Sequence, residues 1–294
     1  MIDRHILRKL MLVEDLPTLP VVMSRILEAI EDEHSSANDL TAILESDHAI
    51  SARVLRTANS AFYGLGREVD SIRRAVVVIG FDAVRMLALA TSVLDAFRRR
   101  RQLALDPDDF WMHSLGAAKA AQVLAGKCCP VESPGGCFTA GLLHDIGKHI
   151  LALTLEEQYR KISETARDSR RALKDIEMEE LNTDHADVGG WIVERWCFPA
   201  TIVDIVRNLY RLTEYTGPCK TETAVVALSS DISRLAGFGH AGDWDERPFD
   251  EEVADYLGLP ADLVNGIAED LGKSRDDARE FLDLLGQGTT AEQE

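Results

Sequence analysis

The sequence lacks several features that define common classes of protein. It contains no run of about 18 apolar residues, which is the length that a membrane-spanning helix requires. Its five cysteines are odd in number and follow no CxxC spacing, as expected of free thiols in a reducing cytoplasm. Residues 1–12 carry scattered charges and no small-residue cleavage site, so no signal peptide is expected. These absences predict a cytoplasmic protein that makes no contact with a membrane.

Basic residues are also scarce. The chain has 32 Lys and Arg against 50 Asp and Glu, which gives a formal net charge of -18. Binding to nucleic acid requires basic patches that face the phosphates, so nucleic acid is not expected as a partner. The one basic cluster, Arg98 to Arg101, lies where a helix is predicted to end. A solvated helix C-terminus is favoured there over a phosphate site.

No stretch alternates between apolar and polar residues as a half-buried strand would, and helical periodicity dominates throughout. The fold class is therefore predicted to be all-α. The proline-containing segment 102–109 is a reasonable boundary between two lobes. We expect an N-terminal helical lobe over residues 1–101, a second helical lobe over 102–240, and C-terminal helices with a polar tail over 241–294.

Three predicted helices carry informative polar residues. A helix from about Asp47 to Asn59 either ends in a left-handed cap at Asn59, which is favoured, or presents Asn59 and Ser60 to the HD lobe or a partner. A helix from Phe110 to Ala125 is apolar on two sides, which is typical of a buried helix and turns His113 inward. The strongly apolar segment 138–153 has four polar residues embedded in it, namely His144, Asp145, Lys148 and His149. His149 is predicted to be a surface or boundary residue.

The adjacent pair His144-Asp145 needs a partner, because burying an unpaired carboxylate is costly. One candidate partner is a divalent metal held by imidazole and carboxylate, a ligand set that suits iron, manganese, zinc or nickel. The other is a closed polar network in which Asp145 accepts hydrogen bonds from His113 or Lys148. Spacing alone leaves both alternatives open and slightly favours the network.

These residues lie in segments that resemble known families. Residues 141–148, with the sequence GLLHDIGK, resemble the central motif of the HD phosphohydrolase superfamily, and residues 110–114 resemble its first-histidine segment. The N-terminal half resembles the HDOD family, the HD-related output domains, through residues 16–20, 47–50 and 56–64. The resemblance covers roughly residues 10 to 240. It implies an N-terminal helical lobe packed on an HD-type helical bundle, in a bacterial protein of signal transduction.

The resemblance to a working hydrolase is incomplete. His185 lies in a segment similar to the one that carries the next histidine of the related cyclic-di-GMP phosphodiesterases. The paired histidines that follow in those enzymes would fall near Asn208 and Leu209. The closing aspartate of HD enzymes falls at Ser230, and Asp231 is one residue away, which is about 100° of rotation on a helix. A site for two metals is therefore predicted to be lost.

The resemblance still allows a site for one divalent ion. Its predicted ligands are His113, His144 and Asp145, with His185 nearby and Asp231 optional. Lys148 and Asn208 are predicted to contact a bound ligand, and no residue is assigned a catalytic role.

The functional prediction is a regulatory domain that binds a partner or ligand and lacks phosphohydrolase activity. The expected partner is an unidentified signalling protein or a nucleotide-type ligand. No receiver domain is expected, so the input must come from another protein or a ligand. The alternative is a metal-dependent phosphohydrolase that acts on a nucleotide or cyclic dinucleotide.

Overall fold

The computed structural model describes residues 2–13, 25–26, 36–60, 68–98, 105–129, 131, 134–245 and 247–286. These residues form helices joined by turns, and no strand occurs among them, so the all-α prediction is confirmed. No helix in the described ranges is long and apolar enough to cross a membrane. The motif at 16–20, the segment 61–64 and Arg99 to Arg101 lie outside the described residues.

The chain divides into two compact units, and each unit combines segments that are distant in sequence. The first unit comprises Met1–Leu16 and Gln102–Lys273, and the second comprises Pro17–Arg101 and Ser274–Glu294. The predicted parts were contiguous, whereas here the first helix of the chain belongs to the same unit as the HD-like segment. The last helix belongs to the same unit as the N-terminal half.

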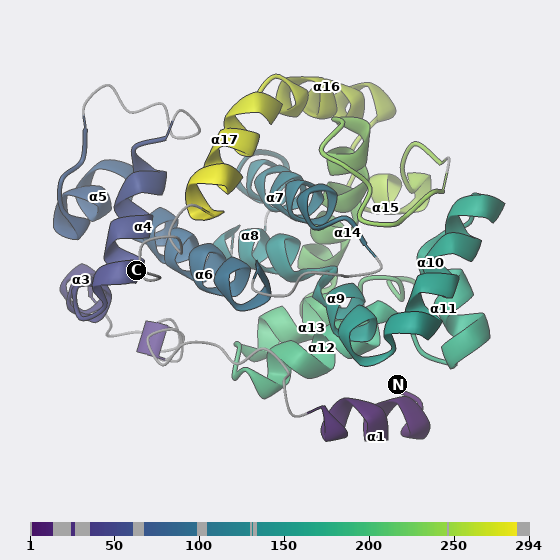
Figure 1. Ribbon diagram of the computed structural model, residues 1–294. Helices are drawn as coiled ribbons and strands as arrows, with labels where there is room; N and C mark the ends of the chain where they lie inside the picture. The colour runs from purple at the N-terminus through teal and green to yellow at the C-terminus, as the bar shows by residue number, and fades with distance from the viewer. Residues whose placement is uncertain are drawn as a thin grey trace. The chain divides into compact units, whose positions relative to one another are not determined.

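The second unit contains five described helices (Figure 1). Asn59 ends one of them, but with a right-handed φ of -86°, so the predicted left-handed cap is wrong. Its amide instead bridges two segments, donating to the carbonyls of Leu55 and Val69 and accepting from the Val69 N–H. The helices are α3 (Ala37–Glu45), α4 (His48–Ala58), α5 (Ile72–Ile79), α6 (Phe81–Arg98) and α17 (Arg275–Gly286).

The first unit holds the HD-like segment, and its helices α7, α8 and α14 lie side by side (Figure 1). α7 is buried around most of its circumference, as its two apolar sides predicted, and His113 on it is buried. The elements of this unit are α1 (Arg4–Leu12), α7 (Pro107–Val123), the π-helix η1 (Leu124–Cys128), α8 (Pro134–Leu143), α9 (Ile146–Thr154), α10 (Glu156–Ser169), α11 (Leu173–Leu181), α12 (His185–Arg195), α13 (Ala200–Arg207), α14 (Lys220–Leu235), α15 (Glu251–Tyr256) and α16 (Ala261–Gly272).

The apolar segment 138–153 is interrupted at the residues that carry its chemistry. α8 ends at Leu143 and α9 begins at Ile146, so His144 and Asp145 form a turn between two helices. His144 Nδ1 contacts the Gly141 carbonyl at 2.7 Å, and the Lys148 N–H donates to the Asp145 carbonyl at 2.9 Å. The turn gives both side chains directions that a continuous helix would not provide.

Helix α9 approaches α12 closely at Gly147. A Cβ atom added there would lie 1.9 Å from the His185 carbonyl oxygen and 2.6 Å from the Gly189 nitrogen. Real Cβ atoms do not approach backbone atoms this closely, so only glycine fits without moving one of the helices. The contact holds His185, at the start of α12, next to the turn that carries Asp145.

We expect Gly147→Ala to lower the free energy of unfolding by roughly 3 kcal/mol, because the new methyl group collides with the backbone of α12. Gly266→Ala on α16 is the matched control, since nothing lies within 4 Å of its added Cβ. That change should stabilise the protein by about 1 kcal/mol through helix propensity. Urea denaturation followed by circular dichroism measures both. Equal effects of the two substitutions would contradict the close packing of α9 on α12.

Candidate metal centre and adjoining cavity

Three predicted ligand residues converge in the first unit. His113 comes from α7, and His144 and Asp145 come from the turn between α8 and α9. All three are buried, and one ligand atom from each lies within 4.8 Å of the other two. This is the one such group of metal-binding side chains found among the described residues. Tertiary packing therefore unites side chains that lie 31 residues apart in sequence.

Backbone carbonyls fix how the two histidine rings are protonated. His113 Nδ1 lies 3.2 Å from the Gly239 carbonyl oxygen, and His144 Nδ1 lies 2.7 Å from that of Gly141. A carbonyl only accepts, so in each ring Nδ1 carries the hydrogen and Nε2 presents a lone pair. Such outer partners orient histidine ligands in metal sites. Both Nε2 atoms face the Ser230 hydroxyl, at 3.1 Å and 3.2 Å.

Asp145 is almost fully buried and is neutralised by a lysine. Its Oδ2 accepts from Lys148 Nζ at 2.8 Å, and the same ammonium group contacts Asp243 Oδ2 at 2.5 Å. Burial opposes ionisation, but the adjacent His144 ring and the Lys148 ammonium hold the pKa of Asp145 well below its usual range. The two carboxylates likewise raise the pKa of Lys148 against the effect of its burial. The group is thus a buried ion triad rather than a single pair.

His185 belongs to a second chain of hydrogen bonds behind Asp145. Its Nδ1 and its backbone N–H both contact Glu177 Oε2, at 2.6 Å and 2.8 Å, and Tyr159 donates to Glu177 Oε1. Burial works against the charged ring, but Glu177 and Asp145 raise the pKa of His185 to about 10. Both ring nitrogens of His185 are engaged, Nδ1 by Glu177 and Nε2 by the Tyr210 hydroxyl at 2.7 Å, and His185 is not part of the three-residue group.

The arrangement fits a divalent cation. Two Nε2 lone pairs and Asp145 Oδ2 face one another, with Nε2–Oδ2 distances of 3.7 Å for His113 and 3.3 Å for His144. Only one hydrogen, on the Ser230 hydroxyl, is available for the two Nε2 atoms. Asp145 Oδ1 is buried and meets no hydrogen-bond criterion within the described part of the chain, although His185 Nε2 lies 3.3 Å from it. Acceptors that face one another in this way repel, and a bound cation would relieve the repulsion.

The remaining predicted site residues are not among the three facing ligands, although Lys148 contacts Asp145 and Asp231 lines the adjoining cavity. Asp231 accepts from Arg234 at 2.7 Å and from the Asp250 N–H at 2.9 Å, and it is not part of the three-residue group. Asn208 donates to the Asp204 carbonyl at 2.8 Å. Lys148 is fully buried between its two carboxylates. Within the described part of the chain, none of the three forms a hydrogen bond or ion pair with His113 or His144, whereas Ser230 contacts both.

His149 corrects one expectation. It is fully buried rather than at the surface, with its ring centre 3.9 Å from that of Phe110 and 5.4 Å from that of Trp111. Burial lowers the pKa of His149 to about 3, so the ring is neutral at physiological pH. Helix α9 is buried on all sides at this point. The position of His149 one helical turn after Asp145 did not indicate this burial.

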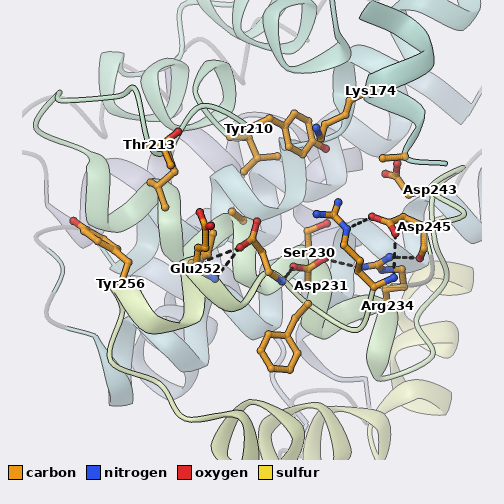
Figure 2. A pocket seen from close by; sticks show the side chains of 18 of the residues that line it. Lys174, Tyr210, Thr213, Ser230, Asp231, Arg234, Asp243, Asp245, Glu252 and Tyr256 are labelled. Carbon is orange, nitrogen blue, oxygen red and sulfur yellow. Dashed lines mark hydrogen bonds and ion pairs between the residues drawn. The ribbon is translucent and has the colours of Figure 1, made fainter.

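A cavity of 520 Å³ adjoins the three-residue group at His113, which is one of its lining residues, and Figure 2 shows part of its wall. His113 and Ser230 line its inner end. The polar residues that also line it are Lys174, Tyr210, Thr213, Lys220, Asp231, Arg234, Asp243, Asp245, Arg247, Asp250, Glu252 and Tyr256. Sequence reasoning missed Tyr210, Asp243 and Glu177, which lie in segments without a distinctive spacing. A ligand in this cavity could therefore reach the acceptor atoms from one side.

Comparison with known proteins identifies the family of this chain. Residues 16–212 match the HDOD domain. An uncharacterized protein of Treponema pallidum (strain Nichols) is 23% identical over 229 residues, which are 76% of this chain and 43% of that protein. The chain thus spans less than half the length of the curated relative that it matches.

Three solved structures resemble the fold. An HDOD domain protein of unknown function from Geobacter sulfurreducens has a TM-score of 0.77 at 24% identity, covering 95% of this chain and 99% of its own. A protein of Marinobacter aquaeolei VT8, provisionally named for signal transduction, has a TM-score of 0.79 at 25% identity, with coverages of 93% and 60%. A protein of Shewanella amazonensis SB2B, provisionally named a phosphohydrolase, has a TM-score of 0.73 at 25% identity, with coverages of 96% and 98%.

The neutral, buried His149 predicts how stability depends on pH. Its pKa is about 3 in the folded protein and near 6.5 when unfolded, so the unfolded state binds more protons between these values. Stability is therefore lost as the pH falls below about 6.5, by about 2 kcal/mol between pH 7 and pH 5. We expect His149→Leu to remove that part of the pH dependence. His5→Leu, at an exposed position on α1, is the control and should leave it unchanged. Urea denaturation at both pH values measures the difference, and identical slopes for wild type and His149→Leu would contradict it.

Proposed function

This chain belongs to the HDOD domain family, and from that membership we propose that it is a bacterial regulatory module of signal transduction. It acts in the cytoplasm by binding a ligand or a partner, and it does not hydrolyse phosphate esters. The family match over residues 16–212 and the neighbour provisionally named for signal transduction support this proposal. The expected partner is a signalling protein or a nucleotide-type ligand.

The observation that carries the proposal is that cationic side chains already contact both carboxylate oxygens of Asp145. Its Oδ2 is bound by the Lys148 ammonium at 2.8 Å, and its Oδ1 faces His185 Nε2 at 3.3 Å. In two-metal hydrolytic sites the ions lie about 3.5–4 Å apart and share ligands. Here two cationic side chains already surround the carboxylate that such ions would share. Ser230 stands where the closing aspartate of HD enzymes is expected, and Asp231 is bound by Arg234.

A single divalent ion remains compatible with this arrangement. His113, His144 and Asp145 would hold it, and three protein ligands leave open positions for a ligand oxygen. When bound, the ion would supply a positive charge that attracts and polarises such an oxygen. The Gly239 and Gly141 carbonyls keep the two imidazoles oriented for this task, and Lys148 keeps Asp145 ionised.

Metal-dependent phosphohydrolysis is the second candidate function. The cavity that reaches His113 and Ser230 favours it, because a phosphate ester could enter there and lie beside one member of the three-residue group. The neighbour provisionally named a phosphohydrolase also favours it. The two candidates differ in turnover and not in binding, so an activity assay separates them.

We expect one divalent ion to bind per chain and to raise the melting temperature, because a ligand that binds only the native state stabilises it by mass action. Free metal at 100 times its Kd stabilises by about 2.7 kcal/mol. The experiment compares melting in a chelator with melting in manganese, iron or zinc. His144→Ala and Asp145→Asn should abolish the shift, and His48→Ala, at an exposed position, should keep it. A wild-type melting temperature that no metal changes, with no metal found after purification, would refute metal binding and leave the polar network as the explanation of the cluster.

We also expect no robust hydrolysis of cyclic-di-GMP with manganese or iron added, since Asn208 and Leu209 supply no imidazole for a second ion. The assay follows product formation by chromatography. Turnover of about 1 per second or faster that His144→Ala abolishes would overturn the regulatory proposal in favour of the hydrolase.

A further inference from the structure

Tyr210 connects the cavity to the buried polar network. Its side chain lines the cavity, with Lys174 beside it (Figure 2). Its hydroxyl oxygen lies 2.7 Å from His185 Nε2, and this is the hydrogen bond that the structure gives it. The Lys174 ammonium lies 5.4 Å from the centre of the Tyr210 ring. A polar group from the network thus reaches the cavity at this point.

The surrounding carboxylates decide which atom donates in this bond. Glu177 accepts from Tyr159 and from the His185 backbone, and it contacts His185 Nδ1 at 2.6 Å, so Nδ1 carries a hydrogen. His185 Nε2 lies 3.3 Å from Asp145 Oδ1 as well as next to Tyr210. A bare lone pair there would face a carboxylate oxygen, so Nε2 also carries a hydrogen and donates to the Tyr210 oxygen. The phenol hydrogen therefore has no acceptor among the described residues.

We propose that Tyr210 is a specificity-determining residue of the cavity, whose O–H donates a hydrogen bond to an anionic oxygen of the bound ligand. His185 and Glu177 are positioning residues that hold the Tyr210 oxygen as an acceptor and so leave its hydrogen for the ligand. The inference rests on the proposed function, because it names the ligand chemistry of the same site. The shared chemistry is an oxyanion, from either a phosphate ester or a carboxylate.

The charges of the cavity wall support an anion at this position. Lys174 stands next to the phenol and also pairs with Asp175 at 3.0 Å, and three further cations line the cavity, namely Lys220, Arg234 and Arg247. Two of the lining carboxylates are paired, Asp243 with Lys148 and Asp245 with Arg247. Asp145, Asp243 and Glu177 nevertheless make the inner end electronegative, and with burial they raise the pKa of Tyr210 and keep it protonated. A cation held by His113, His144 and Asp145 would offset this negative field. Metal and oxyanion should therefore strengthen each other's binding, and the coupling must be reciprocal.

The test is isothermal titration of the full chain with inorganic phosphate, and separately with acetate, each with and without saturating manganese. Tyr210→Phe should weaken oxyanion binding roughly tenfold in manganese, the fold-change expected for one hydrogen bond to a charged group. Tyr256→Phe is the matched control, because it lines the same cavity but its hydroxyl lies 3.4 Å from Thr221 Oγ1. It should leave the affinity unchanged. The preferred anion tells whether the natural ligand is a phosphate ester or a carboxylate.

The two tyrosine variants must also be melted without any anion. A purely structural role for Tyr210 would lower the melting temperature of Tyr210→Phe and leave its oxyanion affinity intact, and that result would overturn the inference. Equal loss of affinity in Tyr210→Phe and Tyr256→Phe, or failure of wild type to bind either anion at millimolar concentration with manganese, would overturn it as well. Hydrolysis of cyclic-di-GMP would refute the regulatory function alone, because the Tyr210 hydrogen bond would still be measured by the titration.

Discussion

The structure of the first unit depends on the burial of one carboxylate. Asp145 is 1% exposed, and an ionised group in such a place is tolerated only if other groups compensate its charge. Lys148 supplies that charge from the same turn of helix, and His185 approaches from α12. The Lys148 ammonium is itself fully buried, so it needs a further acceptor besides Asp145. Asp243 provides one, and thereby brings a distant loop into the network.

The loop at residues 237–245 closes the network from the opposite side. Its Gly239 carbonyl orients His113, and Asp243 accepts both from Lys148 and from the Leu173 N–H at the start of α11. Further along, the Asp245 carbonyl accepts from Arg234 on α14. One loop thus contacts a candidate ligand, the lysine that neutralises another and the wall of the cavity. A substitution in any one of them should therefore destabilise the others, because a buried polar network with unsatisfied members is less stable than a complete one.

The site that results has a mixed character. Its histidines present lone pairs as ligands do, yet its aspartate is bound by cationic side chains as in a structural ion network. This combination suits one cation and a ligand held beside it better than it suits the assembly of two ions and an attacking water. Under the proposed function, stability and binding would depend on the same residues, and the network reaches the cavity at His113, Tyr210 and Asp243.

The sequence by itself determined the helical class and the burial of His113, and it singled out the His-Asp pair as the candidate site, because periodicity and the rarity of buried charge are local properties. It did not reveal that the helix stops at His144, that His149 is buried, or that Asp243, Glu177 and Tyr210 join the site. Those facts depend on which surfaces of α7, α9, α12 and α14 meet, and on a loop more than 90 residues away from Asp145 in sequence, at Asp243. Only tertiary packing decides them, because a contact between residues that are distant in sequence does not change the local hydrophobic periodicity around either residue.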